Sequence, residues 1–339
     1  MIIVTGGAGF IGSALIAALN NPRSSRGPIT DILVVDELAG DEKWKNLRNL
    51  SFADYVEKDD FLEMVVENKL GGPIEAVFHL GASTSTTETN ASYLIKNNYE
   101  YSKILAQWAT DNNIRFIYAS SAATYGDGSE GFNDDEEQIN KLRPLNMYGY
   151  SKHLFDLWAH RSELLKKIVG LKYFNVFGPN EYHKGEMRSF VVKAFEQIKA
   201  PVLSCEGKNG GKVRLFKSYK SEYADGQQMR DFIYVKDAVD MTLFFLDNPR
   251  ISGLFNIGTG KARTWNDLVK SVFAAMGKKP NIEYIDMPES IRNQYQYYTC
   301  ADMTKLLKAG YKRQISSLED AIKDYVQNYL QKDRYLTGD

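Results

Sequence analysis

The first half of the chain is built from apolar blocks that alternate with blocks of amphipathic spacing. Residues 2–5 (IIVT) form an apolar run that ends in a glycine cluster, and residues 10–20 then carry apolar side chains at helical spacing. Further strands are predicted at residues 31–35, 49–56, 75–80 and 115–121, and further helices at residues 60–68 and 88–112. Strands that alternate with helices predict a parallel sheet covered on both faces.

The pattern changes beyond residue 175. Loops lengthen, tyrosines and lysines gather, and the regular alternation of strands and helices breaks, which is typical of a smaller domain that closes over a ligand. We therefore predict an α/β fold, a Rossmann-type doubly wound parallel sheet with a second, smaller mixed α/β domain. The predicted boundaries are 1–174 plus 230–260 for the first domain and 175–229 plus 261–339 for the second.

A glycine cluster joins the first predicted strand to the first predicted helix. Gly6 permits a tight turn, Gly9 lets a pyrophosphate approach the backbone, and Gly12 lets the helix pack closely. The free amides at that helix N-terminus would face the phosphates. Glycines also gather in plain turns, but this cluster lies between a strand and a helix and a second strand ends at Asp36. The context favours a dinucleotide site, so the first domain is the predicted dinucleotide-binding domain and the second the substrate-binding domain.

The loops after two other strands would complete this site, because ligands bind where the carboxyl ends of parallel strands meet. Asp36 is placed to accept hydrogen bonds from the adenosine ribose, which favours NAD. Lys43 and Lys58 could instead pair with the 2′-phosphate of NADP, although most lysines are solvated surface groups. The small polar segment 81–84 would lie under the pyrophosphate, or it is an ordinary strand-to-helix loop.

Two motifs place reactive side chains near the same edge. Residues 120–126 (SSAATYG) put hydroxyl groups, including that of Ser121, at the end of the predicted strand 115–121. Tyr148 and Lys152 are four residues apart in a predicted helix and therefore share a face. Such a pair can be a simple surface pair, but at this distance downstream of a glycine turn it is typical of a catalytic site.

The pair formed by Tyr148 and Lys152 has a chemical use. A phenol with a pKa near 10 must lose about 3 units to act as a base near neutrality, which corresponds to about 4 kcal/mol. The Lys152 ammonium and a positive nicotinamide ring would supply that stabilisation. Ser121 would share the hydroxyl or carbonyl oxygen of the substrate with Tyr148.

Composition argues against several other kinds of protein. With 42 Lys and Arg against 43 Asp and Glu, the formal net charge of −1 creates no global field that attracts nucleic acid or an anionic membrane. Cys205 and Cys300 are the only cysteines and belong to no metal-binding pattern, so we expect neither disulfides nor a metal site. No apolar run approaches the ~18 residues of a spanning helix. We expect a protein of the cytoplasm.

Three segments together carry a family resemblance, namely TGGAGFIG (residues 5–12), ASSAATYG (119–126) and YGYSK (148–152). They resemble the extended short-chain dehydrogenase/reductase family, also called the NAD-dependent epimerase/dehydratase family, whose members oxidise and reduce nucleotide-linked sugars. Further segments are similar to those of the ADP-L-glycero-D-manno-heptose 6-epimerases, and they lie at residues 78–88, 96–103, 173–185, 229–237 and 255–265. The resemblance covers most of the chain.

The resemblance implies an activity. It implies inversion of C6 of an ADP-heptose through a transient ketone, with rotation of the carbonyl and a nicotinamide cofactor that is recycled. Together with Lys43 and Lys58 it implies NADP as the cofactor, with NAD as the alternative. It also implies a homo-oligomer that supplies heptose for the lipopolysaccharide core.

Residue roles follow from the same resemblance. Tyr148 and Lys184 would be the two acid/base groups, and Lys152 would orient the cofactor ribose. Substrate contacts are implied for Ser121, Asn175, Glu186, Lys193, Arg230 and Tyr295. Cofactor contacts are implied for Gly6, Gly9, Phe10, Ile11, Gly12, Asp36, Glu37, Lys43, Lys58, Leu80, Gly81, Ala82, Ser83, Thr84, Asn97, Lys152, Val176 and Lys184.

Arg230 also has an interpretation from its position. It would precede a strand at residues 231–235, beside the ligand edge, where a guanidinium suits bidentate contact with a diphosphate. Asp237 would cap the helix that follows. Residues 219–228 form a longer link than the family usually has, so the role of this segment and the substrate contacts within 186–218 stay open.

Two rival functions are weighed on the residues. A 4-epimerase or a 4,6-dehydratase for another nucleotide sugar is the nearer, but a dehydratase would place an Asp-Glu pair where Thr124 is followed by Tyr125 and Gly126. A non-catalytic cofactor sensor on the same fold is the other, since fold does not fix function. Such sensors tend to lose the tyrosine and lysine pair that this chain keeps as Tyr148 and Lys152.

Overall fold

A seven-stranded parallel sheet forms the centre of the protein in a computed structural model that describes residues 1–22, 26–86, 88–200, 211–292 and 295–338. Its strand order is β10-β6-β5-β4-β1-β2-β3, and each neighbouring pair is parallel. The strands are β1 (Ile2–Thr5), β2 (Ile32–Asp36), β3 (Asp54–Glu57), β4 (Ala76–His79), β5 (Arg115–Ser121), β6 (Val169–Tyr173) and β10 (Gly253–Ile257). The strand order reverses between β1 and β4, which confirms the predicted doubly wound fold.

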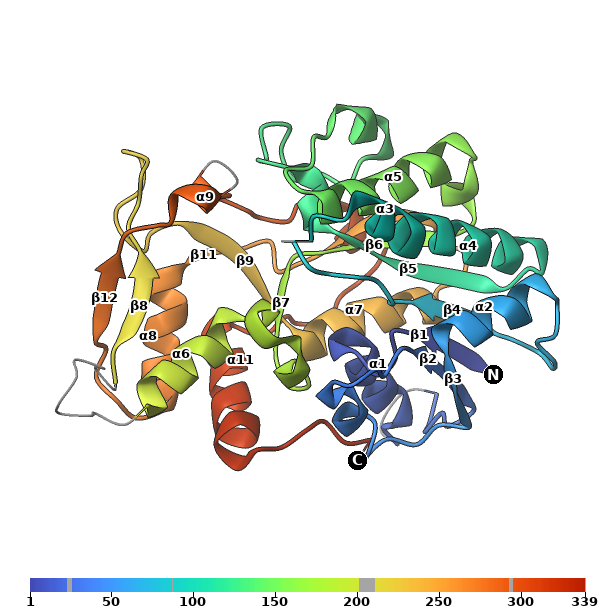
Figure 1. Ribbon diagram of the computed structural model, residues 1–339, viewed down its shortest axis with the longest axis horizontal. Coiled ribbons are helices and arrows are strands. Elements are labelled where there is room, and N and C mark those ends of the chain that lie inside the picture. The colour runs from blue at the N-terminus through green and yellow to red at the C-terminus, as the bar shows by residue number, and fades with distance from the viewer. Residues whose placement is uncertain (23–25, 87, 201–210, 293–294, 339) are drawn as a thin grey trace.

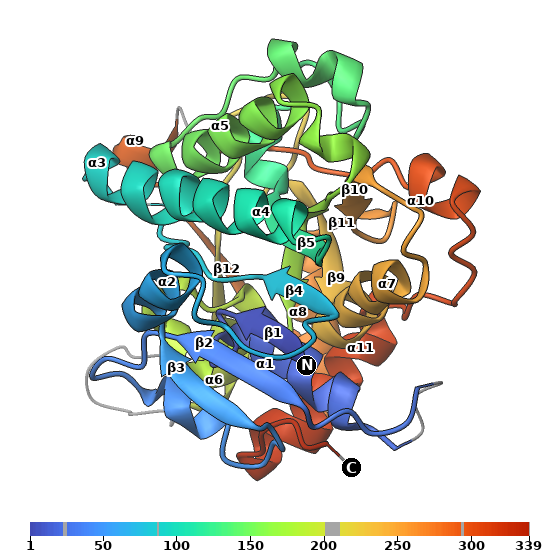
Figure 2. The ribbon, with the colours of Figure 1, turned by 90° about the vertical axis from the view of Figure 1, so that its right-hand side faces the viewer.

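Helices cover both faces of this sheet (Figures 1 and 2). On one face lie α1 (Phe10–Asn20) and α7 (Val235–Asp247), and on the other lie α2 (Lys58–Val66), α4 (Tyr101–Asp111) and α5 (Met147–Arg161). Strand β1 shows why both layers are needed. Ile2 and Val4 pack in the core cluster that holds the α1 side chains, whereas Ile3 packs in the cluster that holds those of α2, α4 and α5. Successive side chains point to opposite faces, so a strand buried on both faces is an uninterrupted apolar run.

A smaller unit stands at one side of the large sheet (Figure 1). The strands β7 (Asn175–Phe177), β9 (Met229–Tyr234) and β11 (Ala262–Thr264) form a mixed sheet, and β8 (Val213–Phe216) pairs in parallel with β12 (Ile282–Ile285). The helices α6 (Phe190–Lys199), α8 (Trp265–Ala275) and α11 (Leu318–Asp324) surround these strands. The predicted second, smaller unit of mixed strands and helices is therefore present, while its residue boundaries stay predictions.

Shorter elements connect these layers. They are η1 (Glu42–Asn46), α3 (Ala91–Leu94), η2 (Ile95–Glu100), η3 (Ala122–Tyr125), η4 (Glu136–Lys141), η5 (Leu164–Lys166), η6 (Tyr182–Met187), α9 (Glu289–Arg292), α10 (Thr304–Lys308), η7 (Tyr325–Tyr329) and η8 (Leu330–Lys332). The predicted helix 88–112 is thus divided into α3, the π-helical turn η2 and α4, and it begins at Ala91 because the Asn90 side chain caps it.

The predicted strand 49–56 was too long at its start. β3 covers only Asp54–Glu57, because the side chain of Asn20 occupies both backbone groups of Ser51, accepting from its N–H at 2.8 Å and donating to its C=O at 2.8 Å. This segment is therefore held against the end of α1 instead of continuing the ladder beside β2.

Two expectations around Arg230 were also wrong. Arg230 lies inside β9, which begins at Met229 and ends at Tyr234. Asp237 does not cap α7, because the helix begins two residues earlier at Val235, and the Asp237 carboxylate instead accepts hydrogen bonds from the backbone and hydroxyl of Ser316 at 3.1 and 3.2 Å. Of the two cysteines, Cys205 and its neighbours 201–210 lie outside the described residues.

Candidate active site

Two pockets lie beside the turn that connects β1 to α1. The first, of about 230 Å³, is lined by Gly6, Asp36, Glu37, Lys43, Lys58, Gly81, Ala82, Ser83 and Asn97 among others. The second, of about 450 Å³, is lined by Phe10, Ile11, Leu80, Ala82, Thr84, Ser121, Tyr148, Lys152, Asn175, Val176, Lys184 and Lys193 among others. Ala82 lines both pockets, which therefore adjoin. Most of the residues singled out from the sequence line one or the other of them.

The glycine turn has the geometry that the sequence predicted. Gly6 adopts a φ of +68°, and a Cβ there would stand 2.6 Å from the amide nitrogen of Gly81. A Cβ on Gly12 would stand 2.1 Å from the carbonyl oxygen of Gly6. Larger side chains at either position would therefore push α1 and the segment after β4 away from the turn.

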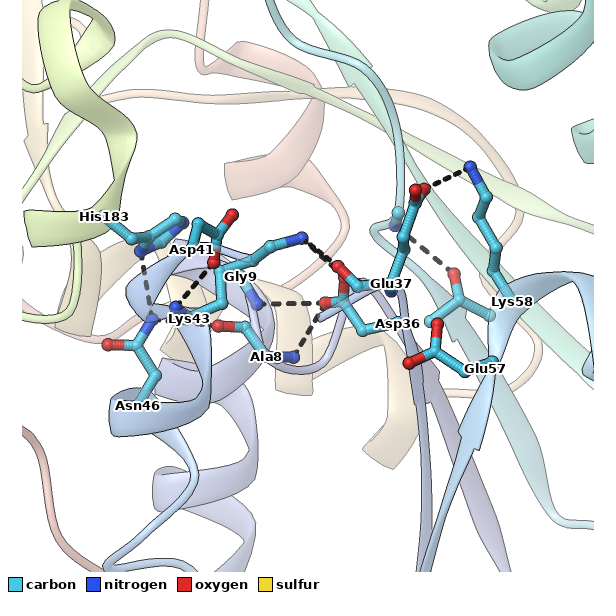
Figure 3. A network of polar contacts seen from close by, with 12 residues as sticks. Ala8, Gly9, Asp36, Glu37, Asp41, Lys43, Asn46, Glu57, Lys58 and His183 are labelled. Carbon is cyan, nitrogen blue, oxygen red and sulfur yellow. Dashed lines mark hydrogen bonds and ion pairs between the residues drawn. The ribbon is translucent and has the colours of Figure 1, made fainter. Parts of the chain in front are cut away.

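The carboxylate of Asp36 is already engaged at this turn (Figure 3). Its Oδ2 accepts hydrogen bonds from the amides of Ala8 and Gly9 at 2.9 and 3.1 Å, and its Oδ1 accepts from the Lys43 ammonium at 3.0 Å. The amide of Glu37 adds a fourth donor at 2.8 Å. Asp36 therefore stabilises the turn itself, a role that the sequence did not reveal.

A second ion pair borders the same pocket. The Lys58 ammonium lies 2.5 Å from the Glu37 carboxylate (Figure 3). It also donates to Asn97 at 3.2 Å. The hydrogen bond from Lys58 holds the pKa of Glu37 below its usual value. Half of the Glu37 side chain is exposed, and exposed pairs contribute little to stability, so Lys58 can exchange this partner for a bound anion at small cost.

These features fit a nicotinamide dinucleotide. Within the described part of the chain the amides of Phe10 and Ile11 have no hydrogen-bond partner, as is normal in the first turn of a helix, and both residues line the second pocket. A diphosphate over the turn could bind these amides, with adenosine in the first pocket and nicotinamide in the second.

The second pocket holds the proposed catalytic pair. Tyr148 and Lys152 both lie on α5, whose first turn is capped by the Asn146 side chain, and they line the cavity together with Ser121 from the end of β5. Burial raises the pKa of Tyr148, and its hydrogen bond with Ser121 lowers the pKa only in part. This direction is opposite to the lowering expected from the Lys152 ammonium, because removal of water from around the phenol disfavours its anion. Burial also lowers the pKa of Lys152 to about 8.

A buried ion pair lies beneath this pair of residues. Asp156 follows Lys152 by one turn of α5 and is fully buried, and its carboxylate accepts hydrogen bonds from Lys172 at 2.9 Å, Ser120 at 2.7 Å and Tyr118 at 2.8 Å. Lys172 also donates to Thr124. The network ties α5 to the end of β5. No prediction from the sequence included Asp156, although its spacing of four from Lys152 was a visible signal.

Lys184 lines the same cavity from another part of the chain. It lies on η6, and its ammonium stands 5.4 Å from the centre of the Phe10 ring. Burial lowers the pKa of Lys184, and the carboxylate of Glu181 partly opposes that shift. Lys184 and Tyr148 therefore line one cavity from different elements.

Arg230 and Tyr295 form a separate cluster. Arg230 is 7% exposed, and its guanidinium lies 5.2 Å from the centre of the Tyr295 ring and 5.8 Å from that of Trp265. Its Nη1 donates to the carbonyl of Met229, and among the described residues no carboxylate pairs with it. Trp265 lines the second pocket, so the cluster adjoins that cavity through this indole, which the sequence analysis had not singled out.

Some residues singled out from the sequence do not line either pocket. Gly9 and Gly12 support the turn, and Glu186 points to solvent, where its carboxylate pairs with Lys193 at 3.2 Å. Arg230 and Tyr295 are also absent from the two linings, as far as residues are described.

The described ranges of the chain contain no cluster of three or more potential metal ligands. They also contain no helix that is both long and apolar enough to cross a membrane.

Comparisons with known proteins agree with this geometry. Residues 2–258 match the NAD dependent epimerase/dehydratase family. The chain is 54% identical over 330 residues to an ADP-L-glycero-D-manno-heptose-6-epimerase from Nitratidesulfovibrio vulgaris, with 97% of this chain and 98% of that protein covered. The crystal structure of the enzyme of that name from Helicobacter pylori is similar with a TM-score of 0.76 and 27% identity, covering 96% of this chain and 95% of that one. A UDP-glucose 4-epimerase from Thermotoga maritima is similar with a TM-score of 0.75 and 27% identity, covering 98% and 99%.

Proposed function

The chain belongs to the NAD dependent epimerase/dehydratase family, and we propose that it inverts C6 of ADP-D-glycero-D-manno-heptose to give ADP-L-glycero-D-manno-heptose. The observation that carries this proposal is the 54% identity, over nearly the whole of both chains, to a protein named for that reaction. The cavity that holds Ser121, Tyr148 and Lys184 supports it, because these side chains are suited to proton transfer at a sugar hydroxyl.

The proposed chemistry proceeds through a ketone at C6. Ser121 and Tyr148 hold the oxygen on C6, and Tyr148 removes the hydroxyl proton as that carbon is oxidised. After the carbonyl has turned, Lys184 delivers a proton to the oxygen from its own side of the cavity. When bound, the nicotinamide ring supplies a reversible acceptor for the hydrogen and electron pair of C6, so no external oxidant or reductant is consumed.

The remaining roles complete the proposal. Lys152 orients the cofactor ribose, and Asn175, Lys193 and Tyr295 contact the substrate. Glu186 is proposed as a further substrate contact, which requires its exposed side chain to turn inward. We further propose a cytoplasmic homo-oligomer that supplies heptose for the lipopolysaccharide core, with residues 1–174 plus 230–260 binding the cofactor and 175–229 plus 261–339 binding the substrate.

An assay of product formation tests the proposed function. The purified protein is incubated with a panel of ADP- and UDP-linked sugars, and the products are resolved by chromatography and NMR. We expect interconversion of the two C6 epimers of ADP-heptose and no reaction with UDP-glucose. Inversion at C4 of a UDP-sugar, loss of water from a sugar, or no reaction with any sugar would favour one of the rival functions.

We propose NADP as the cofactor rather than NAD. Asp36 already accepts four hydrogen bonds from the protein, so its carboxylate is a poor partner for ribose hydroxyls. Lys43 and Lys58 border the pocket assigned to adenosine and carry positive charge that a 2′-phosphate would attract.

Identification of the nucleotide that copurifies with the protein checks this proposal. Denaturation should release NADP, detected by chromatography and mass spectrometry. The double variant Lys43→Ala, Lys58→Ala should retain much less NADP than the parent, since both cations near the 2′-phosphate are lost. Recovery of NAD alone from the parent would overturn the proposal and restore Asp36 as a ribose ligand.

Arg230 is proposed to bind the substrate diphosphate. Its buried guanidinium has no acidic partner among the described residues, which favours an anionic ligand. Arg230→Ala should raise KM roughly 10- to 150-fold, because a hydrogen bond to a charged group contributes about 1.5–3 kcal/mol. Cofactor retention should stay normal. Steady-state kinetics measure the change, and a parental KM would remove Arg230 from the substrate site.

A further inference from the structure

Asn46 connects three separate segments around the glycine turn. It is the last residue of η1 and only 1% of its surface is exposed. Its Nδ2 donates to the carbonyl of Ala8 at 2.9 Å and stands 3.2 Å from Nδ1 of His183 (Figure 3). The same nitrogen donates to the carbonyl of Asn180 at 3.1 Å. One side-chain amide thus joins the glycine turn to the segment immediately before Lys184.

That segment is fixed on its other side as well. Asn180 is fully buried at a φ of +76°, donates to the hydroxyl of Ser13 on α1 at 2.9 Å, and accepts from the backbone of Leu336 at 2.9 Å. The next residue, Glu181, is fully buried and accepts hydrogen bonds from Ser189 and Gly178. The amide of Lys184 in turn donates to the carbonyl of Glu181 at 3.1 Å.

His183 provides the contact closest to Lys184. Burial lowers the pKa of His183 to about 4, opposed in part by Asp41 and Asp36. The ring is therefore neutral near pH 7, so its Nδ1 can be an acceptor that shares one of the two Asn46 amide hydrogens with a carbonyl. The Oδ1 of Asn46 is buried without a hydrogen-bond partner among the described residues. All polar contacts of the Asn46 side chain are thus made by its nitrogen, and loss of Asn46 would release residues 180–183 from the turn.

We propose that Asn46 is a positioning residue. Its hydrogen bonds hold residues 180–183 against the glycine turn and thereby fix the position of Lys184 relative to the cofactor. The inference rests on the proposed function, in which Lys184 transfers a proton. A displacement of about 1 Å can cost a factor of about 10² in rate, so a loose clamp would impair Lys184 without removing it. Because η1 also carries Lys43, the same short element joins the adenosine pocket to the acid/base group.

A double-mutant cycle separates this role from simple structural support. Asn46→Ala should lower kcat at least about tenfold with substrate KM nearly unchanged. In a Lys184→Met background the same change should lower kcat less than about twofold. Once the Lys184 ammonium is gone, displacement of residue 184 has no further proton transfer to impair. Asn20→Ala is the matched control: Asn20 is also a buried asparagine that joins two segments by backbone hydrogen bonds, but it lies at the far end of α1. It should lower thermal stability and leave kcat parental.

Chemical labelling provides a readout that does not need turnover. Amine-modifying reagent is applied to parent and variant, and mass spectrometry gives the rate at each lysine. Asn46→Ala should raise the labelling rate of Lys184 several-fold, while that of Lys193 stays constant. If Asn46→Ala does not fold, His183→Ala replaces it in the double-mutant cycle and in the labelling experiment. This variant removes only the half-buried ring whose Nδ1 faces the Asn46 amide.

The outcomes are distinguishable. An unchanged labelling rate at Lys184, or an equal loss of kcat in both backgrounds, overturns the role of Asn46. A parent protein that does not epimerise ADP-heptose contradicts the proposed function, and the labelling rates then still decide whether Asn46 positions Lys184.

Discussion

Tyr148→Phe is expected to lower the turnover of ADP-heptose by a factor of about 10²–10⁴, the range that general acid–base catalysis contributes. Tyr148 lines the second pocket together with Ser121, with which it forms a hydrogen bond, and the variant removes the phenolic oxygen while the ring still fills its place on α5. Folding and cofactor retention should stay normal. Steady-state kinetics, thermal melting and analysis of the released nucleotide measure the three quantities.

Tyr150→Phe is the matched control, because Tyr150 lies on the same helix and is 44% exposed. It should turn over substrate at the parental rate. Lys184→Met should resemble Tyr148→Phe in its kinetics, since both groups are proposed to transfer protons. Full activity of Lys184→Met together with an inactive Tyr148→Phe would leave a mechanism with one acid/base group.

Lys172→Met is expected to destabilise the protein by about 3–5 kcal/mol, the usual cost of leaving one member of a buried ion pair uncompensated. Lys172 is 1% exposed and its partner Asp156 is fully buried, so the variant would leave the Asp156 carboxylate without its cation on the buried face of α5. Urea denaturation followed by circular dichroism measures the free energy of unfolding.

A matched lysine on the surface provides the comparison. Lys166 pairs with Glu163 at 2.6 Å, but both side chains are more than 70% exposed. Lys166→Met should unfold close to the parental urea concentration, because exposed ion pairs contribute little. Equal midpoints for Lys172→Met and the parent would show that Asp156 does not depend on Lys172.

The sequence was sufficient to predict the main strands of the central sheet. The apolar runs at residues 2–5, 75–80 and 115–121 became β1, β4 and β5, because strands buried on both faces have a distinctive pattern. The spacing of Tyr148 and Lys152 likewise placed both on one face of α5 in one cavity. Each of these features follows from a pattern within one short segment of the chain.

Long-range contacts account for what the sequence did not predict. Ser51 lies outside β3 because Asn20, 31 residues earlier, binds its backbone. The Asp36 carboxylate accepts hydrogen bonds from the amides of Ala8 and Gly9. No local sequence pattern shows whether a carboxylate will bind amides of its own chain or a ligand. Lys184 could be assigned only through a family resemblance, since on its own it would be taken for a loop cation.

Epimerisation in deuterium oxide tests whether C6 is inverted by removal and return of the same hydrogen. The purified protein is incubated with ADP-D-glycero-D-manno-heptose in this solvent, and NMR determines the configuration and the isotope at C6. Since Tyr148 and Lys184 exchange only oxygen-bound protons in this account, the hydrogen removed from C6 should return to it. We predict the L-glycero epimer with protium retained at C6. Deuterium at C6, or substrate recovered without inversion, would contradict the account.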